Sequence, residues 1–157
     1  MKKVKLGNTD LKVSQMGLGC LYFGARDSKE KSFRRMDQYL AAGGNFLDTA
    51  NMYSHWISDE TKGGESEKMI GKWLEARNNR SDVIIASKVG FPYPGTEYGT
   101  SKEQIKEEFH KTLKRLGTDY LDLYYAHTDD FNTSMEETLE AFNDLITEGN
   151  LRAIHLS

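Results

Sequence analysis

Short apolar runs alternate with longer amphipathic stretches along the chain. The apolar runs predict strands at Gln15–Gly19, Asn45–Asp48, Val83–Lys88, Leu121–His127 and Leu151–Ser157. Ahead of them, the segment VKLGNTDLKVSQ is typical of two brief strands joined by a turn at Gly7–Asp10, and we expect a hairpin there. The VIIA run is apolar at every position, as expected for a parallel strand that is covered on both faces.

Amphipathic stretches between these runs predict four helices. They are Lys29–Ala42, Glu65–Arg77 and the segments that follow Ser101 and Ser134. The last two open with capping-box patterns, Ser101 with Gln104 and Ser134 with Glu137. Glycines at positions 43, 117 and 149 are placed to end the first, third and fourth helices. In the second helix, Trp73 lies on the apolar stripe, which favours a place in the core over contact with a cofactor.

The strands recur at a nearly constant interval. Leu47 and Ile85 are 38 residues apart, as are Ile85 and Leu123, which indicates repeated βα units in a doubly wound sheet or a (β/α)8 barrel. A doubly wound sheet would place a dinucleotide fingerprint after its first strand. The stretch Gly17-Leu-Gly19 begins such a motif, but Tyr22 stands where the third glycine is needed. These glycines are better interpreted as shaping a strand end, and without a linker between two cores the chain is predicted to be one domain, 1–157.

Composition narrows the class of protein. The formal charge of −3 and the pI near 5.8 come without a basic stripe, so a nucleic-acid partner is not expected. No stretch has the length and apolarity of a membrane span, so no membrane partner is expected either. The single cysteine, Cys20, cannot form an internal disulfide and fits a reducing compartment. We therefore expect a soluble, cytoplasmic protein.

Four side chains with acid–base chemistry fall at or just beyond the predicted strand ends. Asp48, Lys88 and His127 end consecutive strands, and Tyr53 follows Asp48 by five residues. Each alone has an ordinary interpretation: a helix cap, a solvated lysine, a surface phenol and a hydrogen-bonded strand-end histidine. Because catalytic groups of a barrel lie at the carboxyl ends of its strands, the four together predict a proton-donating site.

The expected chemistry follows from the residue types. A phenol titrates near pH 10, so it protonates an alkoxide slowly at neutral pH unless a cation lowers its pKa. We expect Lys88 to lower the pKa of Tyr53, and Asp48 to supply the counter-charge that a buried ammonium needs. A neutral His127 would hydrogen-bond a carbonyl oxygen and orient the substrate.

Six stretches carry a resemblance to a known family. They are MGLGCLYFG, NFLDTANMYS, GGESEKMIGKWL, VIIASKVG, RLGTDYLDLYYAHTDD and GNLRAIHLS. In order and spacing over the whole chain they resemble the aldo/keto reductases, and most closely the broad bacterial branch that includes the potassium-channel β subunits. The resemblance implies an α/β fold of the (β/α)8 TIM-barrel class. Residues 1–14 would form the bottom hairpin, and residues 15–157 would form strands one to five with their helices.

The resemblance also implies an activity. In the family, NADPH lies extended across the barrel mouth and passes a hydride to an aldehyde or ketone while a tyrosine donates the proton. The catalytic tetrad falls on Asp48, Tyr53, Lys88 and His127. The residues expected to border the cofactor are Gly19, Cys20, Asp48 and Ser157, the last matching the serine of a Ser–Asn pair that holds the carboxamide. The residues expected to wall the substrate pocket are Tyr22, Trp56 and Phe91. No metal is expected.

Two departures from the family pattern affect these expectations. The loop SHWISDETKG after Tyr53 is longer than usual, which leaves the substrate class open. The resemblance stops at Ser157, before the last three βα units and the loops that usually grip phosphate. We therefore expect a truncated chain or a fragment, which either associates with itself through open sheet edges or joins a missing carboxyl-terminal half. The isolated chain is expected to bind NADPH very weakly and to show no appreciable reductase activity.

Other interpretations remain open at this point. A non-catalytic nucleotide-sensing or assembly module is compatible with the same residues. A metal-dependent barrel hydrolase using Asp48, Asp59 and histidines is less favoured, because the first strand ends in Gly-Cys and Lys88 would place a cation in the site. For Cys20, a small buried hydrophobic residue is the favoured alternative to a cofactor contact. The choice between NADPH and NADH depends on the phosphate-binding half.

Overall fold

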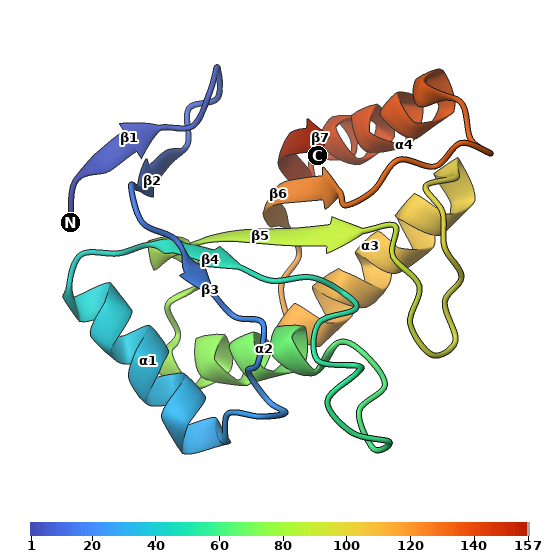
Figure 1. Ribbon diagram of the computed structural model, residues 1–157. Coiled ribbons are helices and arrows are strands. Elements are labelled where there is room, and N and C mark those ends of the chain that lie inside the picture. Colours follow the sequence, from blue (N-terminus) through green and yellow to red (C-terminus); the bar gives the residue numbers. More distant parts are fainter. Residues whose placement is uncertain (157) are drawn as a thin grey trace.

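The computed structural model describes residues 1–156 (Figure 1). The strands are β1 Lys3–Lys5, β2 Lys12–Ser14, β3 Leu18–Gly19, β4 Phe46–Asp48, β5 Ile84–Val89, β6 Leu121–Ala126 and β7 Leu151–Leu156. The helices are α1 Lys29–Ala41, α2 Glu65–Arg77, α3 Lys102–Leu116 and α4 Met135–Thr147, with a 3-10 turn at Arg80–Asp82. Within this range, no helix combines the length and the apolarity that crossing a membrane requires.

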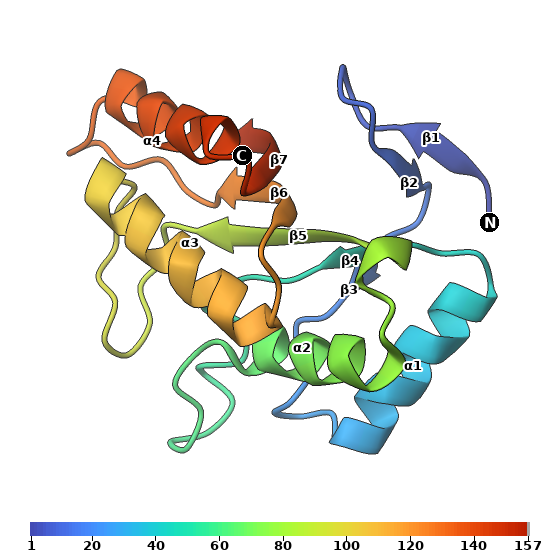
Figure 2. The same cartoon turned by 180° about the vertical axis from the view of Figure 1, so that it is seen from behind.

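Strands β3 to β7 form one parallel sheet in sequence order, and β1 and β2 form a separate antiparallel hairpin. The register pairs Leu47 with Ile85 and Ala86 with Leu123. Each strand of the sheet except the last described one is followed by a helix that returns along its outer face (Figures 1 and 2). The chain therefore has the predicted α/β architecture, which matches the first five βα units of a (β/α)8 barrel.

The main core lies between the sheet and the helices. Alternate strand residues face outward into it, and Leu47, Ile85 and Tyr124 are almost completely buried there. The helix side chains that meet them include Met36, Ile70, Trp73, Ile105, Phe109 and Phe142. Trp73 is 1% exposed and its Nε1 donates a 2.7 Å hydrogen bond to Asp37 Oδ1, so its predicted place in the core is confirmed.

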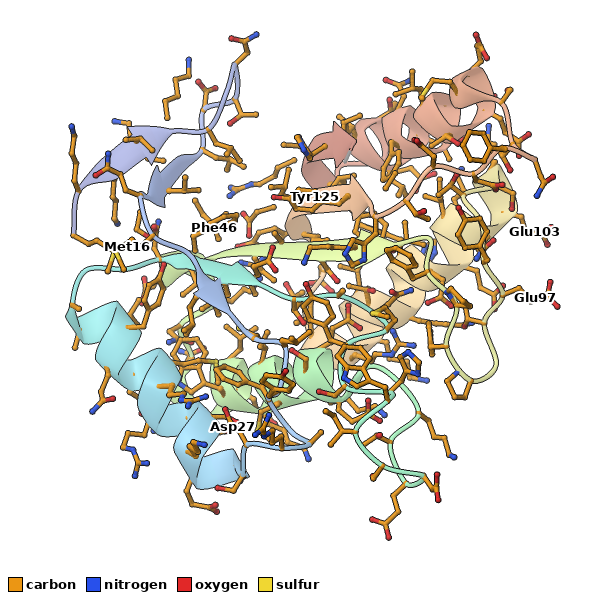
Figure 3. All side chains as sticks on the ribbon, in the orientation of Figure 1. Met16, Asp27, Phe46, Glu97, Glu103 and Tyr125 are labelled. Carbon is orange, nitrogen blue, oxygen red and sulfur yellow. The ribbon has the colours of Figure 1, made fainter. Side chains whose placement is uncertain are left out.

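The opposite face of the sheet carries a smaller apolar cluster. Ala86, Leu123 and Ala153 are buried there, and Phe46 and Tyr125 pack against them. Figure 3 labels Phe46 and Tyr125 on this face, on the other side of the sheet from α2. Leu6 and Leu11 of the hairpin complete the cluster. The hairpin therefore covers the end of the sheet at which β4 and β5 begin.

One asparagine fastens the hairpin to the sheet. Asn45 Oδ1 accepts a 2.8 Å hydrogen bond from Ser14 N, and its Nδ2 donates to Lys12 O at 3.0 Å. The Asn45 amide donates to Ser14 Oγ at 3.1 Å. The strand predicted at Gln15–Gly19 is shorter than expected, because Gln15 N pairs with Lys2 O and so prolongs the hairpin.

The predicted helix ends are largely as expected. Ser101 Oγ and Ser134 Oγ accept hydrogen bonds from the amides of Gln104 and Glu137. Within the part of the chain that the structure describes, neither helix has the reciprocal hydrogen bond of the capping box. Glu137 Oε1 instead accepts from the Lys102 amide at 3.0 Å, so this side chain satisfies the first turn of the neighbouring helix.

Candidate active site

A lysine and an aspartate form an ion pair at the carboxyl edge of the sheet. Asp48 ends β4, Lys88 is the penultimate residue of β5, and their positions place both side chains on the inner face. Lys88 Nζ donates to Asp48 Oδ1 at 2.6 Å and to Thr49 O at 2.7 Å. Lys88 is only 8% exposed, so these oxygens replace much of the water that an ammonium would otherwise bind.

Tyr53 reaches the same ammonium from the loop that follows β4. Lys88 Nζ donates to its phenolic oxygen at 2.8 Å, and this oxygen lies 3.4 Å from Asp48 Oδ1, to which its proton is directed. The loop is held by Ser54, whose φ of +76° is rare outside glycine and whose Oγ donates to Leu21 O at 2.7 Å. Asp48, Tyr53 and Lys88 thus form a closed, hydrogen-bonded triangle.

Burial dominates the electrostatics of this triangle. It lowers the pKa of Lys88 from its ordinary value, and the neighbouring Asp48 carboxylate only partly opposes this effect. Burial, followed by the Asp48 charge, raises the pKa of Tyr53 above its ordinary value. The net direction of the Tyr53 pKa shift is therefore upward, opposite to the direction expected from the Lys88 charge alone. The phenol keeps its proton at neutral pH, and Lys88 lies where it can stabilise the oxygen once that proton leaves.

His127 lies beside the triangle, immediately after β6. Its ring centroid is 6.2 Å from that of Tyr53 and 4.8 Å from that of Phe91, both in edge-on contacts. Burial, together with the nearby Lys88 charge, lowers the pKa of His127 to about 4, so the imidazole is neutral at pH 7. Its Nδ1 is buried and has no hydrogen-bond partner among the described residues.

The residues expected to border a cofactor have different surroundings. Gly19 pairs with Asp48 in the sheet, and a Cβ at this glycine would have no atom within 4 Å, so open space lies beside it. Cys20 is fully buried and its thiol donates to Leu18 O at 3.3 Å. Its side chain is closed to a ligand and behaves as the small buried hydrophobic residue of the alternative interpretation. Ser157 lies outside the described residues.

The three aromatic residues expected to wall a substrate pocket each contact a different neighbour. Phe91 is 36% exposed and meets the His127 ring edge-on. Trp56 is 46% exposed and contacts the ring of its neighbour His55 at 5.2 Å, and Tyr22 lies under the Arg26 guanidinium at 5.3 Å. Of the three, Phe91 is thus the one in ring contact with the predicted catalytic residues.

Sequence reasoning missed a cavity close to His127. It has a volume of about 410 Å³ and lies between the end of β6 and the start of α4. Its lining residues are Thr100, Ala126, Thr128, Asp129, Asp130, Phe131, Thr133, Met135 and Thr138. The available signal was Phe131, an apolar residue within the polar run TDDFNT, which proves to be 94% exposed. Among the described residues, no three His, Cys, Asp or Glu side chains are grouped so that they could hold a metal ion.

Comparison with known proteins bears on this geometry. The model of the aldo/keto reductase family matches residues 15–157. An uncharacterized oxidoreductase of Bacillus subtilis, YqkF, is 37% identical, and the match covers 100% of this chain and 49% of the relative. Norsolorinic acid reductase B of Aspergillus parasiticus is 34% identical, with 94% of this chain and 40% of the relative covered.

A solved structure gives the same result for the fold. The holo form of aldo-keto reductase AKR11C1 from Bacillus halodurans superimposes with a TM-score of 0.84 at 40% sequence identity. The match covers 99% of this chain and 50% of that protein, so this chain spans half the length of the solved relative or of YqkF. Because the family model matches well over half of its residues, the chain belongs to the aldo/keto reductase family.

Proposed function

We propose that the protein formed by these residues reduces an aldehyde or ketone to an alcohol with NADPH, and that Tyr53 is the proton donor. The observation that carries this proposal is the closed triangle of Asp48, Tyr53 and Lys88 beside a neutral His127. The family supports the reaction class. Since this chain spans only about half of its relatives, the reaction is proposed for a barrel that these residues help to form.

Proton transfer is the step that the triangle serves. The protonated phenol of Tyr53 donates to the carbonyl oxygen of the substrate, and the phenolate that remains is stabilised by the Lys88 ammonium, 2.8 Å away. Asp48 balances the lysine charge and keeps Lys88 Nζ directed at the phenol. When bound, the nicotinamide supplies the hydride that the carbonyl carbon accepts.

His127 is proposed to orient the substrate. A neutral imidazole can donate one hydrogen bond and accept another, so an N–H of the His127 ring could donate to a carbonyl oxygen placed beside Tyr53. Phe91 packs against the same ring and is partly exposed, so an apolar or aromatic group next to the carbonyl would meet an apolar surface. We therefore propose that the substrate carries such a group.

Gly19 and Asp48 are proposed to border the nicotinamide. Their pairing in the sheet places them side by side at the carboxyl edge, and the open space beside Gly19 admits a flat ring without a side chain in the way. Ser157 keeps the proposed contact with the carboxamide. Residues 1–157 alone are proposed to bind NADPH very weakly and to show no appreciable turnover. Positioning the reactants supplies about 7–11 kcal/mol of a barrier, and a weakly bound cofactor is not held in position.

The test is Tyr53→Phe in a reductase-competent protein that contains this chain. We expect turnover of an aromatic aldehyde to fall by about 10²–10⁴-fold, the contribution of a positioned general acid, with NADPH affinity unchanged. Tyr120→Phe is the matched control, because Tyr120 precedes β6 at the opposite edge of the sheet. Full turnover in Tyr53→Phe would assign the proton donor elsewhere, and a parallel loss of NADPH binding would make the phenol structural.

A further inference from the structure

A buried carboxylate on α3 lies behind the triangle. Glu108 is 1% exposed, and its Oε2 accepts a 2.8 Å hydrogen bond from Asn51 Nδ2 and a 2.6 Å hydrogen bond from the Tyr93 hydroxyl. Its Oε1 accepts from Lys111 Nζ at 2.9 Å and from Thr96 Oγ1 at 3.3 Å. A single helix side chain therefore joins the loop that follows β4 to the loop that follows β5.

Asn51 connects this carboxylate to the candidate catalytic residues. It is fully buried and lies two residues before Tyr53. The backbone N–H of Asn51 donates to Lys88 O at 3.3 Å, and its backbone carbonyl oxygen accepts from Gly64 N at 2.7 Å. Asn51 thus ties the start of the Tyr53 loop both to the end of that loop and to the strand that carries Lys88. Displacing its side chain would loosen the backbone just ahead of the phenol.

The far end of the Tyr53 loop packs on the same group of residues. Gly63 has a φ of +91°, and a Cβ there would lie 2.4 Å from Tyr93 Cδ2. Gly64 has a φ of +78°, and a Cβ there would lie 2.6 Å from Arg115 Cδ. Arg115 Nη2 in turn donates to the Tyr93 hydroxyl at 2.7 Å. The far end of the Tyr53 loop is therefore seated on Tyr93, which Glu108 holds, and on Arg115, which donates to Tyr93.

The network continues to the strand of Lys88. Arg115 Nη1 lies 2.9 Å from Glu67 Oε2, and Glu67 Oε1 accepts a 2.6 Å hydrogen bond from Ser87 Oγ. Ser87 directly precedes Lys88 on β5. Buried hydrogen bonds therefore lead both to the loop of Tyr53 and to the strand of Lys88. Such bonds are stronger when one of the two partners is ionised.

We propose that Glu108 is a positioning residue, which holds the Tyr53 phenol against the Lys88 ammonium by fixing Asn51 on one loop and Tyr93 on the other. Its importance for turnover rests on the proposed function. The geometric effect does not, because it concerns only the contact between Tyr53 and Lys88. Four donors converge on this one carboxylate, and alanine at position 108 would leave the buried Asn51 amide and Tyr93 hydroxyl without their acceptor.

The experiment observes Tyr53 in the chain of residues 1–157. The chain has eight tyrosines, so labelling them with ¹³C at the ring carbon that bears oxygen gives a small set of NMR signals, and Tyr53→Phe identifies that of Tyr53. Lys88→Met gives the position of this signal when the contact is lost. We expect Glu108→Ala and Asn51→Ala to move the Tyr53 signal toward the Lys88→Met position.

Lys111→Met is the matched control, because it removes a hydrogen bond to Glu108 without touching either loop, and it should leave the Tyr53 signal in place. An unmoved signal in folded Glu108→Ala, or an equal shift in Lys111→Met, would overturn the proposal. If Glu108→Ala does not fold, Glu108→Gln and Tyr93→Phe take its place. Glu108→Gln keeps an acceptor oxygen and should retain most of the wild-type signal position, whereas Tyr93→Phe should shift it.

The consequence for turnover is tested separately in a reductase-competent protein that contains this chain. There Glu108→Ala should lower kcat at least tenfold with little change in KM, since it misplaces the proton donor without altering the substrate surface. A Tyr53 shift without any reductase activity in the wild type would refute the proposed function and leave the positioning role standing. Unchanged kcat in Glu108→Ala despite a shifted Tyr53 signal would refute the catalytic importance of this residue.

Discussion

The two partners of the Asp48–Lys88 ion pair should differ widely in their effect on stability. The side chain of Lys88 is 10% exposed, whereas that of Asp48 is 31% exposed. Lys88→Met removes the buried charge, keeps most of the apolar stem and leaves a carboxylate that water can reach. Asp48→Asn instead leaves an ammonium buried against neutral oxygens, those of Thr49 and Tyr53.

The magnitudes follow from this difference in exposure. Removing one partner of a buried pair costs about 3–5 kcal/mol when the other charge is left uncompensated. Two neutral acceptors remain around Lys88, so we expect Asp48→Asn to lower the free energy of unfolding by about 3 kcal/mol. Lys88→Met removes a charge that burial already disfavours, and we expect a change within about 1 kcal/mol of zero. The double variant should resemble Lys88→Met.

Urea unfolding followed by circular dichroism at pH 7 measures these differences, with an unchanged m-value as the check on two-state behaviour. Because the pKa of Lys88 is lowered in the folded chain, the unfolded chain binds its proton more tightly, and wild-type stability gains from this group as pH rises toward 10.5. Lys88→Met lacks that gain. A loss in Lys88→Met equal to or larger than that in Asp48→Asn would refute the reasoning from exposure.

Two further outcomes are expected. Gly71→Ala should destabilise the chain by about 1–3 kcal/mol in thermal unfolding, because the new alanine Cβ would lie 2.4 Å from Arg115 O. This cost should exceed the gain from the better helix propensity of alanine, and a gain in stability would mean that α2 and α3 can separate freely. His127 should titrate near pH 4 by NMR. The free energy of unfolding should fall as the pH drops from 6.5 toward 4, because the histidine of the unfolded chain is protonated first. His127→Asn should lose this part of the pH dependence.

The positions of the strand ends, and with them the triangle, followed from local patterns. Apolar runs and helical periodicity depend on neighbouring residues, and parallel strands bring their carboxyl ends to one edge wherever they pair. These rules were enough to predict that Asp48 and Lys88 lie close together. The direction of the Tyr53 pKa shift was not predictable, because it depends on how deeply the phenol is buried and on how close the Asp48 carboxylate lies.

Glu108 shows most clearly why the rest of the site escaped prediction. It lies in the run KEEFHK beside Glu107. Helical spacing places Glu108 on the face of Ile105 and Phe109 and turns Glu107 away from it, but the sequence does not show which groups a carboxylate on that face would bind. In the structure, the Glu107 side chain is 63% exposed, whereas that of Glu108 is 2% exposed. The donors that Glu108 binds, Asn51 and Tyr93, lie far from it in the sequence, and nothing there indicates the contact. A charged pair on a helix is ordinarily interpreted as a solvated face.

The similar chain separations of the β4–β5 and β5–β6 pairings have a consequence for the order of folding. Leu47 pairs with Ile85, 38 residues away, and Ala86 pairs with Leu123, 37 residues away, so the two pairings close chain segments of nearly equal length at nearly equal entropic cost. The pairing that buries more residues should then form first. β5 and β6 are both six residues long, and every residue of β5 is buried, whereas β4 has only three residues. Of these two pairings, that of β5 with β6 around α3 should therefore form first, with β4 and the Tyr53 loop docking later onto a carboxylate that is already in place.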